Sequence, residues 1–243
     1  MQAKSNYAGE SMWLQADNAP RKRMGQRRET GHNAAMETRA LKSEEVQKAR
    51  LDQRFAPHVA PLNRWAEEQS VGGRWLPYFD PADGGREARV LLLLESPGPV
   101  VSRTRFVSMD NPDGTAENMR CLIHLSGLRR SDVALWNAVP WQMSEGGVVT
   151  PRPAQYAEAA PLTRQVLEQM PRLGVVVLVG RHAQQAWSLA GSSLPTLACP
   201  HPSPQNFVSR RGSAVLALEM LVQARQLSRG PVPAEGATPS PKE

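Results

Sequence analysis

The chain has 243 residues and a formal net charge of +6, with 29 Lys and Arg against 23 Asp and Glu. This length allows one domain with extensions or two small ones, and the positive charge favours a polyanionic partner, with nucleic acid as the first candidate. Two cysteines are too few for a disulfide framework or a four-thiolate cluster. No stretch reaches the ~20 apolar residues of a membrane span, and residues 1–18 lack a signal-peptide pattern, so we expect a cytoplasmic protein with no membrane partner.

Residues 1–42 are predicted to be a basic, disordered arm, because they are polar and show no sustained apolar period. A cluster of basic residues lies within it: Arg21, Lys22, Arg23, Arg27 and Arg28. Two interpretations stay open, a solubilising tail or an arm that promotes encounter with DNA by neutralising phosphates. Residues 229–243, rich in Pro, Gly, Ala and Ser, are predicted to be an unstructured tail.

Residues 43–228 are predicted to be one domain in which strands alternate with helices. A helix over 43–55, with Ser43 as its N-cap, and a short one over 61–70 are expected at the domain edge. Apolar strands are then predicted at 88–94, 133–139, 173–179 and, more weakly, 195–199, and helices at 113–127, 155–170, 182–189 and 212–227. This alternation predicts an α/β/α sandwich with a central, mostly parallel sheet of about four strands.

Three loops at the carboxyl ends of these strands carry polar side chains among prolines and glycines. They read Glu-Ser-Pro-Gly-Pro at 95–99, Asn-Ala-Val-Pro-Trp at 137–141 and Pro-His-Pro-Ser-Pro-Gln-Asn at 200–206. Ligands of open parallel sheets bind beyond the carboxyl ends of the strands, and proline fixes the backbone that presents a side chain there. The loops therefore predict a preorganised pocket. The alternative is that their prolines and glycines only form ordinary turns between the strands and helices.

The order of these motifs resembles the uracil-DNA glycosylase superfamily over residues 88–227. The most specific element is His-Pro-Ser-Pro at 201–204 together with Leu-Glu-Ser-Pro-Gly at 94–98. The resemblance implies hydrolytic removal of a deaminated base, most readily uracil, that is flipped out of single- or double-stranded DNA, as in base-excision repair. It also implies a monomer without cofactor or metal, since the iron–sulfur branches use four cysteines and this chain has two.

The resemblance assigns base recognition and catalysis to three residues. Phe106 matches the aromatic residue that stacks on the flipped base, and Asn137 matches the strand-end asparagine that reads a pyrimidine edge. His201 matches the histidine that faces the base oxygen where negative charge develops. Each has a structural alternative: a core aromatic, an asparagine capping a turn, and a structural histidine.

The residues after His201 resemble the loop that contacts DNA, with Gln205 as the candidate wedge. Ser203 and Asn206 belong to the same loop, and Arg210 and Arg211 follow at a spacing suited to phosphate contacts. A solvated basic face is the alternative for the two arginines.

The turn after the first strand departs from the best-known family pattern. Ser96 stands where the most active branch has a water-orienting aspartate, Glu95 is an acid one place earlier, and Leu94 replaces a family glycine. Serine supplies neither a carboxylate nor a strong base, so rate and substrate are in doubt. Three roles stay open for Glu95: it orients water, it binds the base, or it only ties the turn to the backbone.

Two other functions compete with a glycosylase. Ser96 and His201, with an intervening aspartate, have the order of an α/β-hydrolase triad, but the first glycine of the nucleophile elbow is absent. Pro97 also removes an N–H from the oxyanion hole, which disfavours that interpretation. The second alternative, a catalytically weak or inactive glycosylase-like protein that only binds DNA, stays open.

Overall fold

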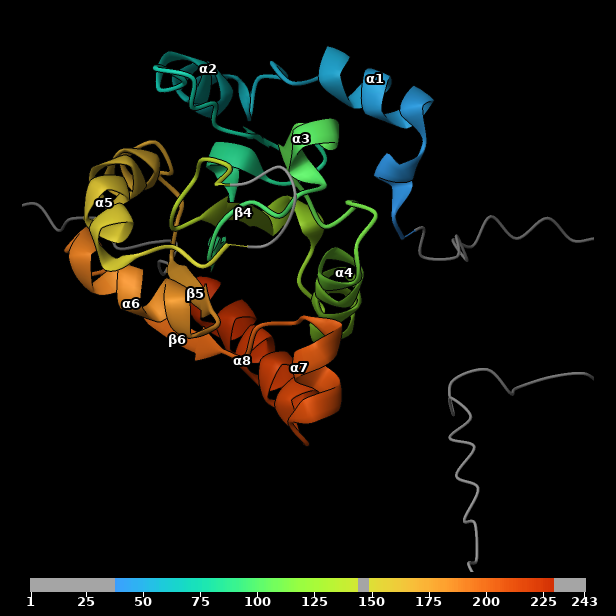
Figure 1. Ribbon diagram of the computed structural model, residues 1–243. Helices are drawn as coiled ribbons and strands as arrows, with labels where there is room; N and C mark the ends of the chain where they lie inside the picture. The colour runs from blue at the N-terminus through green and yellow to red at the C-terminus, as the bar shows by residue number, and fades with distance from the viewer. Residues whose placement is uncertain (1–37, 144–148, 230–243) are drawn as a thin grey trace, which may run out of the picture. The chain divides into compact units, whose positions relative to one another are not determined.

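The computed structural model describes residues 38–143 and 149–229, which form the predicted α/β/α sandwich (Figure 1). Its central sheet has four parallel strands in the order β4-β2-β5-β6. They are β2 (Val90–Leu94), β4 (Val133–Asn137), β5 (Val175–Val179) and β6 (Thr196–Cys199). Because Leu94 pairs with Asn137 and Val179 with Cys199, the strands end at one edge of the sheet, and the loops that follow them emerge together.

Side chains alternate between the two faces of this sheet and build two apolar cores. Leu91 and Leu93 point into one core, and Val90 and Leu92 point into the other. All four are essentially inaccessible to solvent. A continuous apolar run is thus explained by burial on both faces, as expected for a parallel sheet.

Five helices cover the two faces. One core includes residues of α2 (Ala60–Glu68), α5 (Pro153–Glu168) and α6 (Arg181–Ala190), and the other includes residues of α4 (Gly114–Ser126) and α8 (Ser213–Ser228). Figure 1 shows α5 and α6 on one side of the sheet and α4 and α8 on the other. α2 packs through Leu62 and Ala66, which are fully buried in the core, while Arg64, Glu67 and Glu68 of the same helix are exposed.

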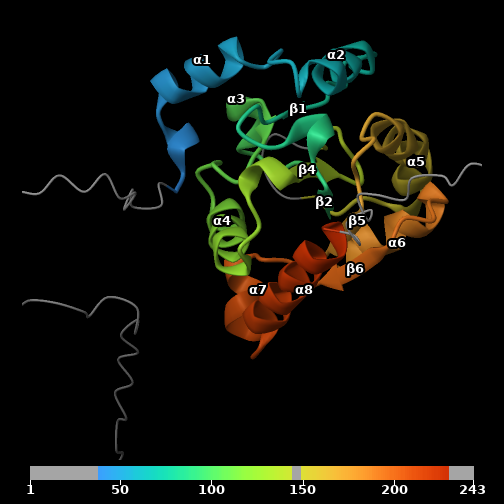
Figure 2. The ribbon, with the colours of Figure 1, turned by 180° about the vertical axis from the view of Figure 1, so that it is seen from behind.

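Several short elements were not predicted, because they are too brief to show a period. β1 (Tyr78–Phe79) and β3 (Phe106–Val107) form a second, two-stranded parallel sheet. Figure 2 shows β1 near α2 and α3 (Val101–Thr104), with α1 (Glu44–Asp52) beyond them. The remaining short elements are α7 (Pro204–Ser209) and the 3-10 turns Ala40–Lys42, Gly85–Glu87 and Arg130–Asp132.

The packed domain begins before residue 43. Leu41 is fully buried, and its backbone N–H donates to the carbonyl of Asp110 at 3.1 Å. Residues 38–42, predicted to belong to the arm, are therefore part of the domain. The basic cluster at residues 21–28 and the tail from residue 230 lie outside the described residues. No helix in the described ranges combines the length and apolarity needed to cross a membrane.

Candidate active site

A cavity of about 450 Å³ lies at the carboxyl edge of the sheet. Four predicted site residues line it: Glu95 and Ser96 in the loop after β2, Asn137 at the end of β4, and His201 in the loop after β6. These residues are up to 106 positions apart in the sequence, and the sheet brings them together as the parallel topology predicts.

The loop after β2 is tied to the loop after β4, which fixes Glu95. The N–H of Ala138 donates to the carbonyl of Leu94 at 2.8 Å, and the N–H of Val139 donates to the carbonyl of Glu95 at 3.0 Å. Burial raises the pKa of the Glu95 carboxyl above its usual value, while the nearby charges of His182 and Arg181 oppose that rise. One carboxylate oxygen, Oε1, is buried and has no hydrogen-bond partner among the described residues. It is free to accept a hydrogen bond from a ligand or a water molecule.

Asn137 presents an unused donor at the cavity wall. The residue is 2 % exposed, and its Nδ2 has no partner in the described part of the chain. A buried polar group without a partner costs roughly 1–3 kcal/mol. A ligand carbonyl that accepts from Nδ2 recovers this energy, which favours Asn137 as a binding residue.

The backbone of the loop that carries His201 is held by two side-chain amides. The amide of Asn206 donates to the carbonyl of His201 at 2.8 Å, and the amide of Asn118 on α4 donates to the carbonyl of Pro202 at 2.8 Å. Burial lowers the pKa of His201 below its usual value, against an opposing effect of Asp113. The imidazole is therefore neutral at pH 7, and one ring nitrogen carries a proton that it can donate.

A second cavity of about 930 Å³ adjoins the first. Its lining includes all five residues predicted to contact DNA: Ser203, Gln205, Asn206, Arg210 and Arg211. Two of them also have local structural contacts, because the Ser203 hydroxyl accepts from the N–H of Asn206 and caps α7. Among the described residues, Glu95 and His201 are the two that line both cavities.

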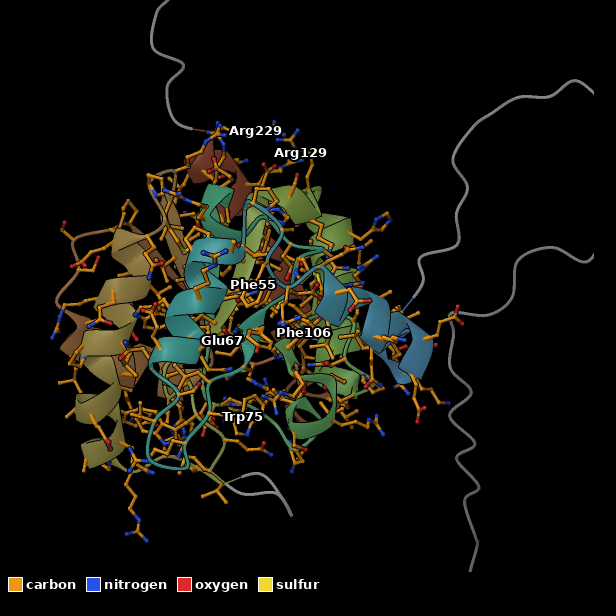
Figure 3. All side chains as sticks on the ribbon, turned by 90° about the horizontal axis from the view of Figure 1, so that it is seen from above. Phe55, Glu67, Trp75, Phe106, Arg129 and Arg229 are labelled. Carbon is orange, nitrogen blue, oxygen red and sulfur yellow. The ribbon has the colours of Figure 1, made fainter. Side chains whose placement is uncertain are left out.

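Phe106, predicted to stack on the base, is not among the described residues that line either cavity. Its side chain is fully buried in β3, and its ring packs against Tyr78 with the ring centroids 5.9 Å apart. Figure 3 shows it among the packed side chains of the interior. The cavity is lined instead by the next two residues, Val107 and Ser108. The Phe106 ring is packed in the interior in this structure, and its role in stacking on a base stays a prediction.

Sequence reasoning missed Asn111, which lines the smaller cavity and is 3 % exposed. Its Nδ2 donates to the carbonyl of Phe106 at 3.0 Å, and its Oδ1 is buried without a partner among the described residues. The Asp-Asn-Pro-Asp sequence around it reads as an ordinary turn. Only the fold shows that this turn faces the cavity.

Also missed were Arg181 and His182, which line the larger cavity at the start of α6. The Arg181 Nε donates to His182 Nε2 at 3.3 Å, and His182 Nδ1 lies 2.9 Å from the Tyr156 hydroxyl. Both ring nitrogens of His182 therefore have a side-chain neighbour, Arg181 at Nε2 and Tyr156 at Nδ1. The signal available in the sequence was the position directly after a strand and a glycine.

A buried ionic network supports the turn that carries Asn111. Its members are Asp80, Asp83 and Asp110 with Arg50, Arg120 and Arg130. Ser108 donates to the carboxylate of Asp80, and the N–H of Asp110 donates to the Ser108 hydroxyl at 2.9 Å. The cavity wall from residue 108 to 111 is therefore anchored by a shared network of three carboxyl and three guanidinium groups.

In the described ranges, no group of three or more His, Cys, Asp or Glu side chains is arranged to hold a metal ion. Cys121 and Cys199 are both free thiols. The chemistry that the site offers is that of a carboxylate, a neutral imidazole and two amides.

Comparison with known proteins identifies one family. The model of the Uracil DNA glycosylase superfamily matches residues 81–222, more than half of the chain. The matched segment contains the four strands of the central sheet and every residue named above as lining the two cavities. No curated protein matches the sequence.

Proposed function

Because the chain belongs to the uracil-DNA glycosylase superfamily, we propose that it is a monofunctional DNA glycosylase of base-excision repair. Its substrate is a deaminated base in DNA, with uracil foremost, and its product is an abasic site. The observation that carries this proposal is the position of Glu95 and His201 on the wall shared by both cavities.

The two cavities divide a flipped nucleotide between them. The smaller one, about 450 Å³, takes the base, and the larger one, about 930 Å³, takes the sugar and the flanking phosphates. The N-glycosidic bond then crosses the boundary at which Glu95 and His201 lie. Among its described lining residues, the larger cavity has Arg181, Arg210 and Arg211, which suit a phosphate backbone.

The reaction is a hydrolysis at C1′ of the deoxyribose. The bond between C1′ and the base nitrogen breaks, its electron pair leaves with the base, and the oxygen of a water molecule bonds to C1′. His201 donates a hydrogen bond to the base oxygen that gains negative charge, an effect typically worth about 2.7–4 kcal/mol. The ionised Glu95 stabilises the cationic sugar, orients the water and accepts the proton that the water loses as the C1′–O bond forms. The departing base anion takes up a proton from solvent, and Glu95 returns its proton to solvent, so the products are the abasic sugar and the neutral base.

The lining residues favour hydrolysis over a covalent mechanism. No lysine is among the described residues of either cavity, so no amine is in place to form a Schiff base with the sugar. Ser96 lines the smaller cavity but has no carboxylate. The described lining residues of that cavity include two acids, Glu95 and Asp113. Asp113 caps the N-terminus of α4, which leaves Glu95 for catalysis.

Release of the base distinguishes this function from DNA binding alone. Purified protein is incubated with labelled single- and double-stranded oligonucleotides that carry uracil, hypoxanthine, xanthine or a mismatched thymine, and is then treated with alkali. A glycosylase produces alkali-labile breaks at the lesion and releases the free base. Binding to the same oligonucleotides without breaks would instead identify a glycosylase-like protein that only binds DNA.

A further inference from the structure

Three of the six buried side-chain atoms without partners in the described residues belong to the wall of the smaller cavity: Glu95 Oε1, Asn111 Oδ1 and Asn137 Nδ2. Native proteins pair nearly all buried polar atoms, so such a concentration points to a ligand that supplies the partners. Glu95 is committed to the water and sugar in the proposed reaction. The two amide atoms, one acceptor and one donor, are left for the base.

The amide of Asn111 has a fixed orientation. Its Nδ2 faces the carbonyl of Phe106 at 3.0 Å, and a carbonyl can only accept. Rotating the amide by 180° would place two oxygens against each other, so Oδ1 stays on the side away from that carbonyl. The turn itself is fixed by the N–H of Asp113, which donates to the carbonyl of Asn111 at 2.8 Å, and by the ionic network behind Ser108.

We propose that Asn111 is a specificity-determining residue whose Oδ1 accepts an N–H of the bound base, while Asn137 Nδ2 donates to the neighbouring carbonyl. This inference rests on the proposed function and deepens it. The pair of asparagines reads a lactam edge, –NH–C(=O)–, which uracil presents at N3 and C4 and hypoxanthine and xanthine present at N1 and C6. Deamination creates this edge from the amidine edge of cytosine or adenine.

The undamaged bases present the opposite pattern to both asparagines. Cytosine would place its unprotonated N3 against the Asn111 oxygen and its amino group against the Asn137 N–H. Asn137 alone could adapt by turning its amide, whereas the anchored Asn111 cannot. Thymine and guanine carry the lactam edge as well, so the two asparagines select the edge and the shape of the cavity selects the ring.

Binding of inert substrate analogues tests Asn111 independently of catalysis. Full-length protein is titrated with two single-stranded oligonucleotides that differ at one position, 2′-fluoro-deoxyuridine or 2′-fluoro-deoxycytidine, because the fluorine slows cleavage. We expect the wild type to bind the uridine oligonucleotide about tenfold more tightly or better, which corresponds to one discriminating hydrogen bond. Asn111→Leu should bring the two dissociation constants to within about threefold.

Two further variants separate recognition from folding. Asn111→Asp retains an acceptor oxygen and should keep the preference for uridine even where it lowers the melting temperature. Ser126→Ala removes a buried hydroxyl that bonds to backbone groups of α4 and Leu128, outside both cavities, and should also keep the preference.

The outcomes are distinguishable from failure of the proposed function. A wild-type protein that binds the uridine analogue preferentially but releases no base would refute the glycosylase and retain the role of Asn111. An unchanged preference in Asn111→Leu, or a wild type with equal affinity for both analogues, would overturn the inference.

Discussion

Gly180 and His201 are in close contact: a Cβ atom added at Gly180 would lie 3.1 Å from the Cβ of His201. Gly180 also has φ of 82° and ψ of 165°, a conformation that only glycine adopts readily. The residue joins the end of β5 to α6, so one backbone position both turns the chain and leaves room for the proposed catalytic imidazole.

We therefore predict that Gly180→Ala lowers base release more than it lowers stability. The added methyl group strains the turn, at roughly 1–3 kcal/mol, and pushes His201 away from its hydrogen-bonding position. Gly191→Ala is the matched control, because Gly191 ends the same helix with φ of 65° and a Cβ atom added there would have nothing within 4 Å of it. Single-turnover rates and melting temperatures of both variants check this, and equal loss of activity in the two would argue against the contact.

The acid limb of the pH–rate profile should report the ionisation of Glu95. Burial raises its pKa and the positive charge of Arg181 opposes that rise, so activity falls as the pH drops through a value above the usual one for glutamate. Glu95→Gln should lower the rate and abolish this limb. Arg181→Ala should move the limb to higher pH, since a charge that favours the carboxylate is lost.

Arg172→Ala serves as the control for that experiment. Arg172 is exposed, pairs with Glu87 at 3.5 Å and lines neither cavity among their described residues. Its profile should overlay that of the wild type. A limb that stays in place in both arginine variants would show that Arg181 does not act on Glu95.

The free energy of unfolding should depend on pH through the raised pKa of the buried Asp83 carboxyl group. Burial raises its pKa to about 7, with Arg130 as the main opposing charge. Because the unfolded chain releases this proton near pH 4 and the folded chain only near pH 7, the free energy of unfolding should decrease as the pH rises between these values, by at most about 4 kcal/mol. Urea unfolding of Asp83→Asn should show a smaller decrease over this range.

The pair of Asp132 with Arg129, of which the arginine is exposed, provides the comparison. Asp132→Asn should change the free energy of unfolding at a fixed pH by no more than about 1 kcal/mol, because an ion pair near the surface contributes little. An Asp83→Asn variant with the slope of the wild type would mean that the pKa of Asp83 is the same in the folded and the unfolded chain.

The sequence predicted the central sheet well because three of its strands, β2, β4 and β5, are largely apolar runs buried on both faces, as at residues 175–179, whereas the edge strand β6 is mostly exposed and gave a weaker signal. Parallel topology then predicted that Glu95, Asn137 and His201 meet at one edge. The surroundings of Phe106 could not be predicted from the motif, which gives only its place in the chain. The direction of its side chain depends on the pairing of β3 with β1, which is two residues long and has no sequence signal, and its stacking role stays a prediction. Asn111 was missed because a polar turn shows no sign of what it faces.

The salt dependence of DNA binding tests the larger cavity. If Arg210 and Arg211 each contact a phosphate, the double alanine variant should reduce the slope of log affinity against log salt concentration by about 1.4 on single strands and about 1.8 on duplex DNA. Affinity should fall alike for damaged and undamaged oligonucleotides. A slope equal to that of the wild type would place the two arginines on a solvated face.

The central claim is most directly tested by the rate of base release under single-turnover conditions, with wild type and His201→Ala on the same uracil-containing oligonucleotide. Loss of one donor to a developing anion costs about 10²–10³ in rate, so the variant should release uracil at least about a hundredfold more slowly while its affinity for DNA changes little. Equal rates in the two proteins, or no release of any base by the wild type, would contradict the account.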